Sequence, residues 1–313
     1  MKTLRSSVLL LMACILILSG CQSNGSGGAE NNDKLKVVAT IAQIGEPLNT
    51  ISGDLIEVTS LMGPGVDPHL YQATTGDISK LDRSDAIFYN GLHLEANMLA
   101  VFDEMSKSKP VLALGETLAE DRLLKDETGA IDPHIWFDID LWQAALEAAV
   151  DQLIELVPEH KEQLIANRDA YFAQLAELKQ ESSEKLAAIP EEQRILVTAH
   201  DAFGYFGAAN GLQVVGLQGL STEDEIGLSD IEDTIDLLIE YQVPAVFIES
   251  SINPDSINAV IEGAKRHGLE VALGGELFSD AMGASGTVEG TYLGMYAHNV
   301  ETISSALLDK GEE

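Results

Sequence analysis

The chain has 313 residues, 45% of them hydrophobic, and its 51 acidic residues against 18 basic ones give a formal net charge of −33. This balance argues against nucleic acid as a partner, because phosphate binding depends on Lys and Arg. The length and apolar fraction are sufficient for two globular domains of ordinary size.

The chain begins as secreted proteins do. Lys2 and Arg5 precede an apolar run over residues 8–18, which is too short to span a bilayer comfortably. Small residues then lead to Cys21, an arrangement that resembles the lipobox of bacterial lipoproteins, which are cleaved before the cysteine and lipidated on it. An ordinary signal peptide with an incidental cysteine is the alternative. We therefore predict a signal peptide at residues 1–20 and an extracytoplasmic protein anchored to the cell membrane by a lipidated Cys21.

The next segment, residues 21–34, is rich in Gly, Ser and Asn and has no apolar periodicity, so it is expected to be a flexible tether. The chain has two cysteines, and Cys14 lies in the predicted signal peptide. The mature chain would therefore have no pair for an internal disulfide. Any metal ion would have to be held by His, Asp and Glu.

The body of the chain alternates short apolar runs with longer amphipathic segments, a pattern typical of βα units and parallel sheets. The expected strands lie at residues 35–40, 56–61, 86–89 and 111–114 in the first half and at 195–198, 213–216, 245–248 and 271–273 in the second. The sequence thus predicts an α/β fold with two lobes, each with a central, mostly parallel sheet flanked by helices. The expected lobes span residues 35–158 and 190–313.

A long helix is predicted between the lobes, at residues 159–189. Pro158 and Pro190 bracket this segment, and no Gly or Pro interrupts it. At about 1.5 Å per residue it would be near 45 Å long. We expect it to join the two lobes; a helix packed only on the second sheet is the alternative.

The tripeptide Asp-Pro-His occurs twice, at residues 67–69 and 132–134. Proline fixes one backbone angle and stiffens the approach to each imidazole. A single such histidine is more often a surface-loop residue, but two copies in one chain favour a function for His69 and His134.

Three further candidates follow expected strands: His200, Glu249 and Asp280. In open parallel sheets the ligand crevice lies beyond the carboxyl ends of the strands, so these side chains and His69 could meet in one cleft. Each residue taken alone could instead be a turn or capping residue. The group as a whole favours a site between two lobes.

The motifs resemble those of metal-binding solute-binding lipoproteins of manganese and zinc ABC transporters, of the cluster A-I type. The resemblance runs from about residue 37 to residue 303 and rests on residues 66–69 with Tyr71, 90–95, 132–136, 198–206, 249–251 and 277–280. It implies one metal ion between two α/β lobes, with His69, His134, His200 and Asp280 as ligands. Some manganese-type members have Glu where this chain has His200, and zinc-dedicated members often have a His-rich loop that this chain lacks.

The identity of the metal therefore stays open between Zn²⁺ and Mn²⁺. Imidazoles favour zinc, whereas a carboxylate that binds through both oxygens would allow a five-coordinate site better suited to manganese. We expect Glu249 to accept an N–H from a ligand imidazole, with direct ligation as the alternative. His93 is expected to be a structural residue near the cleft, and surface or packing roles are expected for His160, His267 and His298.

The function predicted from the sequence is capture of a divalent metal ion and its delivery to a cognate ABC permease by a monomeric protein that is not an enzyme. Four protein ligands leave no position for a reactive water. The alternatives are a secreted zinc-dependent hydrolase, with Asp280 or Glu249 as general base, and a surface adhesin with a structural metal. Because binding requires neutral imidazoles, affinity is expected to fall as the pH drops through about 6.5.

Overall fold

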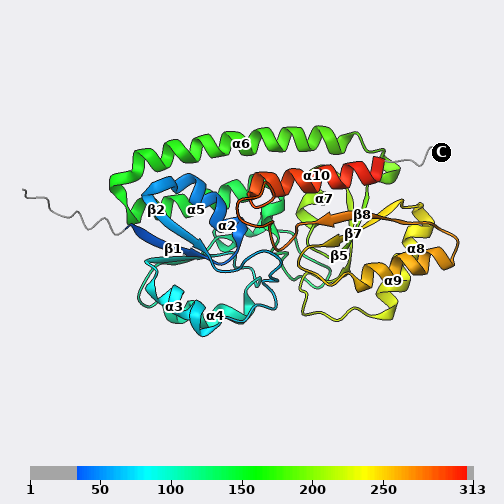
Figure 1. Ribbon diagram of the computed structural model, residues 1–313, viewed down its shortest axis with the longest axis horizontal. Helices are drawn as coiled ribbons and strands as arrows, with labels where there is room; N and C mark the ends of the chain where they lie inside the picture. The colour runs from blue at the N-terminus through cyan, green and yellow to red at the C-terminus, as the bar shows by residue number, and fades with distance from the viewer. Residues whose placement is uncertain (1–33, 309–313) are drawn as a thin grey trace, which may run out of the picture. The chain divides into compact units, whose positions relative to one another are not determined.

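The computed structural model describes residues 34–308 (Figure 1). The predicted signal peptide, the tether up to residue 33 and the lipidation site Cys21 lie outside the described residues. Across residues 34–308, no helix combines the length and the apolar character needed to cross a membrane.

The first sheet has four parallel strands in the order β2-β1-β3-β4. They are β1 (Leu35–Ala39), β2 (Ile56–Ser60), β3 (Ala86–Tyr89) and β4 (Val111–Ala113). The two central strands are almost continuously apolar, as expected for parallel strands that are covered by helices on both faces. The order of the strands places the switch point of the sheet between β1 and β3, where ligands bind in folds of this kind.

Helices cover both faces of this sheet (Figure 1). On one side lie α2 (Ala42–Ser52) and α5 (Ile139–Leu156), and on the other α3 (Thr75–Arg83) and α4 (Leu99–Met105). Local capping fixes where two of them begin, because Thr74 and Asp77 form a capping box at α3 and the Asp138 carboxylate accepts two N–H groups at α5.

The second half contains two pairs of parallel strands, and the two inner strands, β5 and β7, lie side by side. The strands are β5 (Ile195–His200), β6 (Gln213–Gln218), β7 (Ala245–Glu249) and β8 (Ala272–Leu277). The resulting order β6-β5-β7-β8 repeats that of the first sheet. The helices of this half are α7 (Gly204–Asn210), α8 (Leu228–Tyr241), α9 (Asp255–Arg266) and α10 (Tyr292–Leu308).

The long helix α6 (Lys161–Ala187) has 27 residues and contacts both halves (Figure 1). It packs against α2 and α5 on one side and against α7 and α10 on the other. One large hydrophobic cluster contains buried residues of both halves and of α6. A smaller cluster lies within the second half. The short turns are 3₁₀ helices: η1 (Gly53–Leu55), η2 (Ala96–Met98), η3 (Gly115–Thr117), η4 (Glu120–Arg122), η5 (Ile135–Phe137), η6 (Pro158–His160) and η7 (Glu191–Gln193).

The predicted fold class is confirmed: two α/β lobes with parallel strands are joined by one long helix. The lobe boundaries at residues 158 and 190 stay a prediction. Strands β5 and β6 run two residues further than predicted, and β8 differs most, because it continues through Gly274 and Gly275 to Leu277. These glycines do not end the strand; a Cβ at Gly274 would come within 2.6 Å of the Phe247 ring, so the close packing against β7 requires glycine there.

Candidate metal centre

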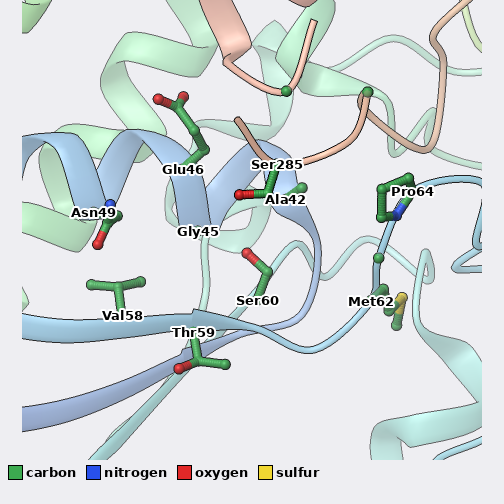
Figure 2. A pocket seen from close by; sticks show the side chains of 13 residues that line it. Ala42, Gly45, Glu46, Asn49, Val58, Thr59, Ser60, Met62, Pro64 and Ser285 are labelled. Atoms are coloured by element: carbon green, nitrogen blue, oxygen red, sulfur yellow. The ribbon is translucent and has the colours of Figure 1, made fainter. Parts of the chain in front are cut away.

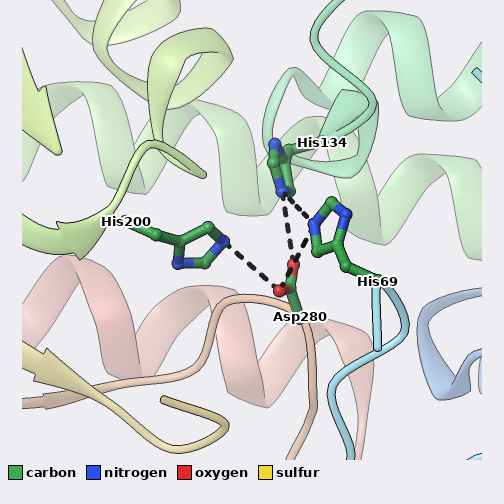
Figure 3. A group of neighbouring side chains, drawn as sticks. All are labelled: His69, His134, His200 and Asp280. Carbon is green, nitrogen blue, oxygen red and sulfur yellow. Dashed lines mark hydrogen bonds and ion pairs between the residues drawn. The ribbon is translucent and has the colours of Figure 1, made fainter. Parts of the chain in front are cut away.

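Four buried side chains meet between the two lobes: His69, His134, His200 and Asp280 (Figure 3). Each offers one potential ligand atom, and these atoms all lie within 4.8 Å of one another. The side chains are at most 3% exposed. Two ligand candidates come from the first half of the chain and two from the second.

The distances within the group converge on one point. The Asp280 Oδ1 atom lies 3.3 Å from His134 Nε2, and Asp280 Oδ2 lies 3.3 Å from His200 Nε2 and 3.7 Å from His69 Nε2. The two Nε2 atoms of His69 and His134 are 3.4 Å apart. Donors about 2.0–2.1 Å from a tetrahedral Zn²⁺ are about 3.3 Å from each other, so this group has the size of a metal coordination shell.

His69 is positioned through its backbone. It follows β2 in the first Asp-Pro-His tripeptide, and its N–H donates to Asp67 Oδ1 at 2.8 Å. Its carbonyl accepts from the Asn97 side chain, also at 2.8 Å. These bonds fix the loop on both sides of the histidine and aim its ring at Asp280.

His134 is positioned through its ring as well as its backbone. Asp132 Oδ1 lies 2.7 Å from His134 Nδ1 and also accepts the backbone N–H of His134 at 2.9 Å. The ring packs edge-on against Trp136, with the centroids 5.3 Å apart. A carboxylate behind Nδ1 selects the tautomer that leaves Nε2 free to bind metal.

His200 is the last residue of β5, and Glu249 is the last residue of the neighbouring strand β7. They therefore meet at the switch point of the second set of strands. Glu249 Oε2 lies 2.6 Å from His200 Nδ1, and Oε1 accepts the His200 backbone N–H at 2.9 Å. Glu249 thus faces the side of the imidazole that points away from Asp280, which favours the indirect role predicted for it over direct ligation.

Asp280 lies on the loop that follows β8, and this loop is fastened from both lobes. The side chain of Asn299 donates to the carbonyl of Phe278 and accepts its N–H. From the first lobe, Gln43 of α2 donates to the carbonyl of Ser279 at 3.1 Å. The carboxylate is thereby held with both oxygens toward the imidazoles.

The charges of the group are strongly coupled. Burial lowers the pKa of His69 to about 4, against the opposing charge of Asp280. For His134, burial acts in the same direction, but Asp132 and Asp280 outweigh it and raise the pKa to about 9. Glu249 and Asp280 likewise outweigh burial and raise the pKa of His200 well above its ordinary value.

Asp280 shows the opposite behaviour, because burial would raise its pKa but the neighbouring imidazoles hold it well below the ordinary value. When no metal is bound, protons on His134 and His200 therefore balance the Asp280 charge. These protons sit on the atoms that face the centre of the group, so a cation and the protons compete for the same place.

The other histidines lie outside this group. His93 is exposed and has a positive φ of 68°. The buried Glu95 nearby serves the backbone, accepting from the N–H groups of Asn90 and Gly91 and from the Thr40 hydroxyl. His160 lies in a 3₁₀ turn before α6, His267 at the end of α9, and His298 on α10 against Phe278.

A separate pocket of about 430 Å³ lies between α2, β2 and the loop at residues 283–290 (Figure 2). It contains one acid, Glu46, which already accepts the Tyr292 N–H at 2.9 Å and the Thr50 hydroxyl at 2.9 Å. No histidine lines it. The pocket therefore lacks the donors of a transition-metal site.

Sequence comparison places the chain among known proteins. Residues 37–306 match the family model described as zinc-uptake complex component A, periplasmic. The chain belongs to this family. The resemblance read from its motifs is thus confirmed.

Individual members of the family are closely similar to the chain. The manganese-binding lipoprotein MntA of Bacillus subtilis is 46% identical over 302 residues, which cover 95% of this chain and 98% of MntA. The zinc-binding protein TroA of Treponema pallidum is 42% identical over 301 residues, again covering 95% and 98%. The solved structure of the periplasmic zinc-binding TroA superposes with a TM-score of 0.86 at 44% identity, covering 88% of this chain and 99% of that one.

Replacing Glu249 with Gln is expected to lower metal affinity by about 10- to 100-fold, because the His200 ring would lose the charge that orients it and increases its basicity. Competition with a chelator of known affinity measures the change. Glu232→Gln, on the exposed side of α8, is the matched control and should bind as the unmodified protein does. A loss well beyond 100-fold would instead favour Glu249 as a direct ligand.

Proposed function

We propose that this protein is an extracytoplasmic solute-binding lipoprotein that captures one Zn²⁺ or Mn²⁺ ion between its lobes and delivers it to an ABC permease. The observation that carries the proposal is the group of four buried donors, His69, His134, His200 and Asp280, spaced as a coordination shell requires. Two relatives of the protein are named as a manganese-binding lipoprotein and a zinc-binding protein, and the matching family model is described as a component of a zinc-uptake complex.

The donor set suits either metal. Three imidazoles favour Zn²⁺ by the usual order of affinities. The Asp280 carboxylate turns Oδ1 toward His134 and Oδ2 toward His69 and His200, so it can bind through both oxygens. That mode would raise the coordination number to five and suit Mn²⁺. Both ions are therefore proposed as cargo.

The number of protein donors and their burial favour delivery of the metal ion over catalysis. Catalytic zinc sites combine three protein ligands with an open position for water, whereas here four protein donors surround the centre. Glu249, one general base of the hydrolase alternative, is 3% exposed and lies against His200. The other, Asp280, lies within the donor set itself. A surface adhesin with a structural metal would not need the two-lobed site.

The proposed partners and location are supported by the names of relatives and by the signal-peptide pattern predicted for residues 1–20. Several relatives are named as lipoproteins or as substrate-binding lipoproteins of metal ABC transporters. We propose that residues 1–20 are removed, that Cys21 carries the lipid, and that residues 21–34 tether the monomer to the outside of the membrane. Residues 35–158, 159–189 and 190–313 would be the first lobe, the linking helix and the second lobe.

The purified protein is expected to bind one Zn²⁺ or Mn²⁺ ion per chain without hydrolytic turnover. His134→Ala should reduce the metal affinity at least about 100-fold, because the substitution removes a buried ligand and leaves its partner Asp132 without the imidazole. Elemental analysis and chelator competition provide the measurement. His267→Ala, an exposed histidine at the end of α9, is the matched control.

Cells that depend on this protein for metal uptake test the delivery step. His134→Ala should abolish their high-affinity uptake, while His267→Ala should leave it intact. Full affinity in His134→Ala would contradict the proposed site, and metal-dependent turnover of a substrate would favour the hydrolase.

A further inference from the structure

The loop between β6 and α8, residues 219–227, reaches across to the loop that carries His69. The Thr222 hydroxyl donates to Asp67 Oδ2 at 2.6 Å. One residue further on, Glu223 Oε1 accepts from the Asn97 side chain at 3.1 Å, and Asn97 also donates to the carbonyl of His69. Both contacts of this loop with the first lobe therefore end next to one ligand candidate, His69.

At the first-lobe end, the Asp67 carboxylate has two separate tasks. Its Oδ1 accepts the backbone N–H of His69 at 2.8 Å and so shapes the ligand loop. Its Oδ2 accepts the Thr222 hydroxyl from the other lobe. A displacement of Thr222 would thus be transmitted to His69 through a single side chain.

At the second-lobe end, Thr222 is fastened to the strands that carry His200. Gln218 is the residue of β6 that pairs with His200 of β5. The Gln218 side chain donates to the carbonyls of Thr222, at 2.7 Å, and of Asp224. The contacts therefore form a continuous path from His200 through Gln218, Thr222 and Asp67 to His69.

The two lobes are not closely packed next to this path of contacts, so the hydrogen bonds along it help to hold them together. A pocket of about 340 Å³ opens beside it and is lined by both Asp67 and Thr222. The lobes are thus incompletely packed at this edge, and polar links bridge the gap. Both links end on a carboxylate, but the Thr222–Asp67 bond is short and half-buried, whereas Asn97 and Glu223 are exposed.

We propose that Thr222 is a positioning residue that locks the lobes over the captured metal and slows its departure, acting on His69 through Asp67. The inference rests on the proposed function. Because the four donors are at most 3% exposed, the metal ion can leave only when the lobes separate locally, and that separation must break the Thr222 hydrogen bond. Capture precedes the formation of this bond, so the lock acts on the dissociation rate more than on the association rate.

The test is Thr222→Val, which keeps the shape of the side chain and removes the hydroxyl. Zn²⁺ is loaded on the full protein and its release into an excess of a chromophoric chelator is followed by stopped flow. We expect release about tenfold faster than from the unmodified protein, the loss typical of one hydrogen bond to a charged group, with the association rate within about twofold. Thr222→Ser, which restores the hydroxyl, should restore slow release.

A matched control is Thr128→Val. Thr128 also donates to a carboxylate, Asp126 Oδ1 at 2.7 Å, but in an exposed turn of one lobe. Its release rate should equal that of the unmodified protein. A rate for Thr222→Val within twofold of the unmodified protein, or an equal rise in Thr128→Val, would overturn the inference while leaving the proposed function intact. Failure of the unmodified protein to bind either Zn²⁺ or Mn²⁺ would refute the proposed function and this inference with it.

Discussion

Asp280→Asn is expected to weaken metal binding by about 100- to 1,000-fold, the largest effect of any single conservative substitution in this protein. Asp280 supplies the negative charge among the four donors and contacts all three imidazoles. Removing a buried charge from such a group leaves its partners uncompensated, at a cost of about 3–5 kcal/mol. Chelator competition at a fixed pH measures the loss.

The size of this effect is reduced by one opposing change. Asp280 also raises the pKa values of His134 and His200, so its neutralisation makes those imidazoles easier to deprotonate. Asp151→Asn, on the exposed side of α5, is the matched control and should bind normally. An affinity within tenfold of the unmodified protein for Asp280→Asn would remove Asp280 from the ligand set.

Metal binding at pH 7.5 is expected to release about two protons per ion. The pKa of His134 is raised to about 9 and that of His200 is raised well above 6.5, so both rings carry a proton that the metal ion must displace. Affinity should therefore rise by about tenfold per pH unit for each proton displaced, up to about pH 9. The sequence alone predicted a dependence centred near 6.5.

Calorimetric titration in two buffers of different ionisation enthalpy counts the released protons. Asp132→Asn should reduce the number, because the charge of Asp132 is the main cause that raises the pKa of His134. Release of no protons at pH 7.5 would contradict the charge state derived for the group.

The same shift predicts the stability of the metal-free protein. The pKa of His134 in the folded protein, about 9, is above its ordinary value of 6.5. Its ion pairs therefore stabilise the fold fully below pH 6.5, and this contribution is lost as the pH rises through 9. The melting temperature of the metal-free protein should fall over that range.

Most of the fold could be predicted because its signals are local. Eight apolar runs separated by Gly, Pro and polar residues mark the eight strands found between residues 34 and 308, and the uninterrupted segment between Pro158 and Pro190 marks α6. The extent of β8 could not be predicted, because Gly274 and Gly275 end a strand in most contexts. Here Gly274 lies against Phe247 across the pair of strands, and Gly275 has a positive φ and lies against Thr302.

The four ligand candidates were also predicted, two from a repeated tripeptide and two from their places after strands. The residues that hold them in place were mostly missed. Asp132 had a local signal, its position two residues before His134. Gln43 and Thr222 had none, because they act on segments 236 and 155 positions away in the sequence. Such contacts exist only once the chain has folded.

The spacing of the ligand candidates along the chain determines whether folding or metal binding comes first. Even His69 and His134, the nearest two, are 65 positions apart, and all four are brought together by four different loops and strand ends. The unfolded chain therefore contains no chelating pair from this set. Unlike a zinc finger, whose metal drives its folding, this protein must fold first and load afterwards. A surplus of metal would then raise the population of correctly folded molecules without trapping misfolded ones.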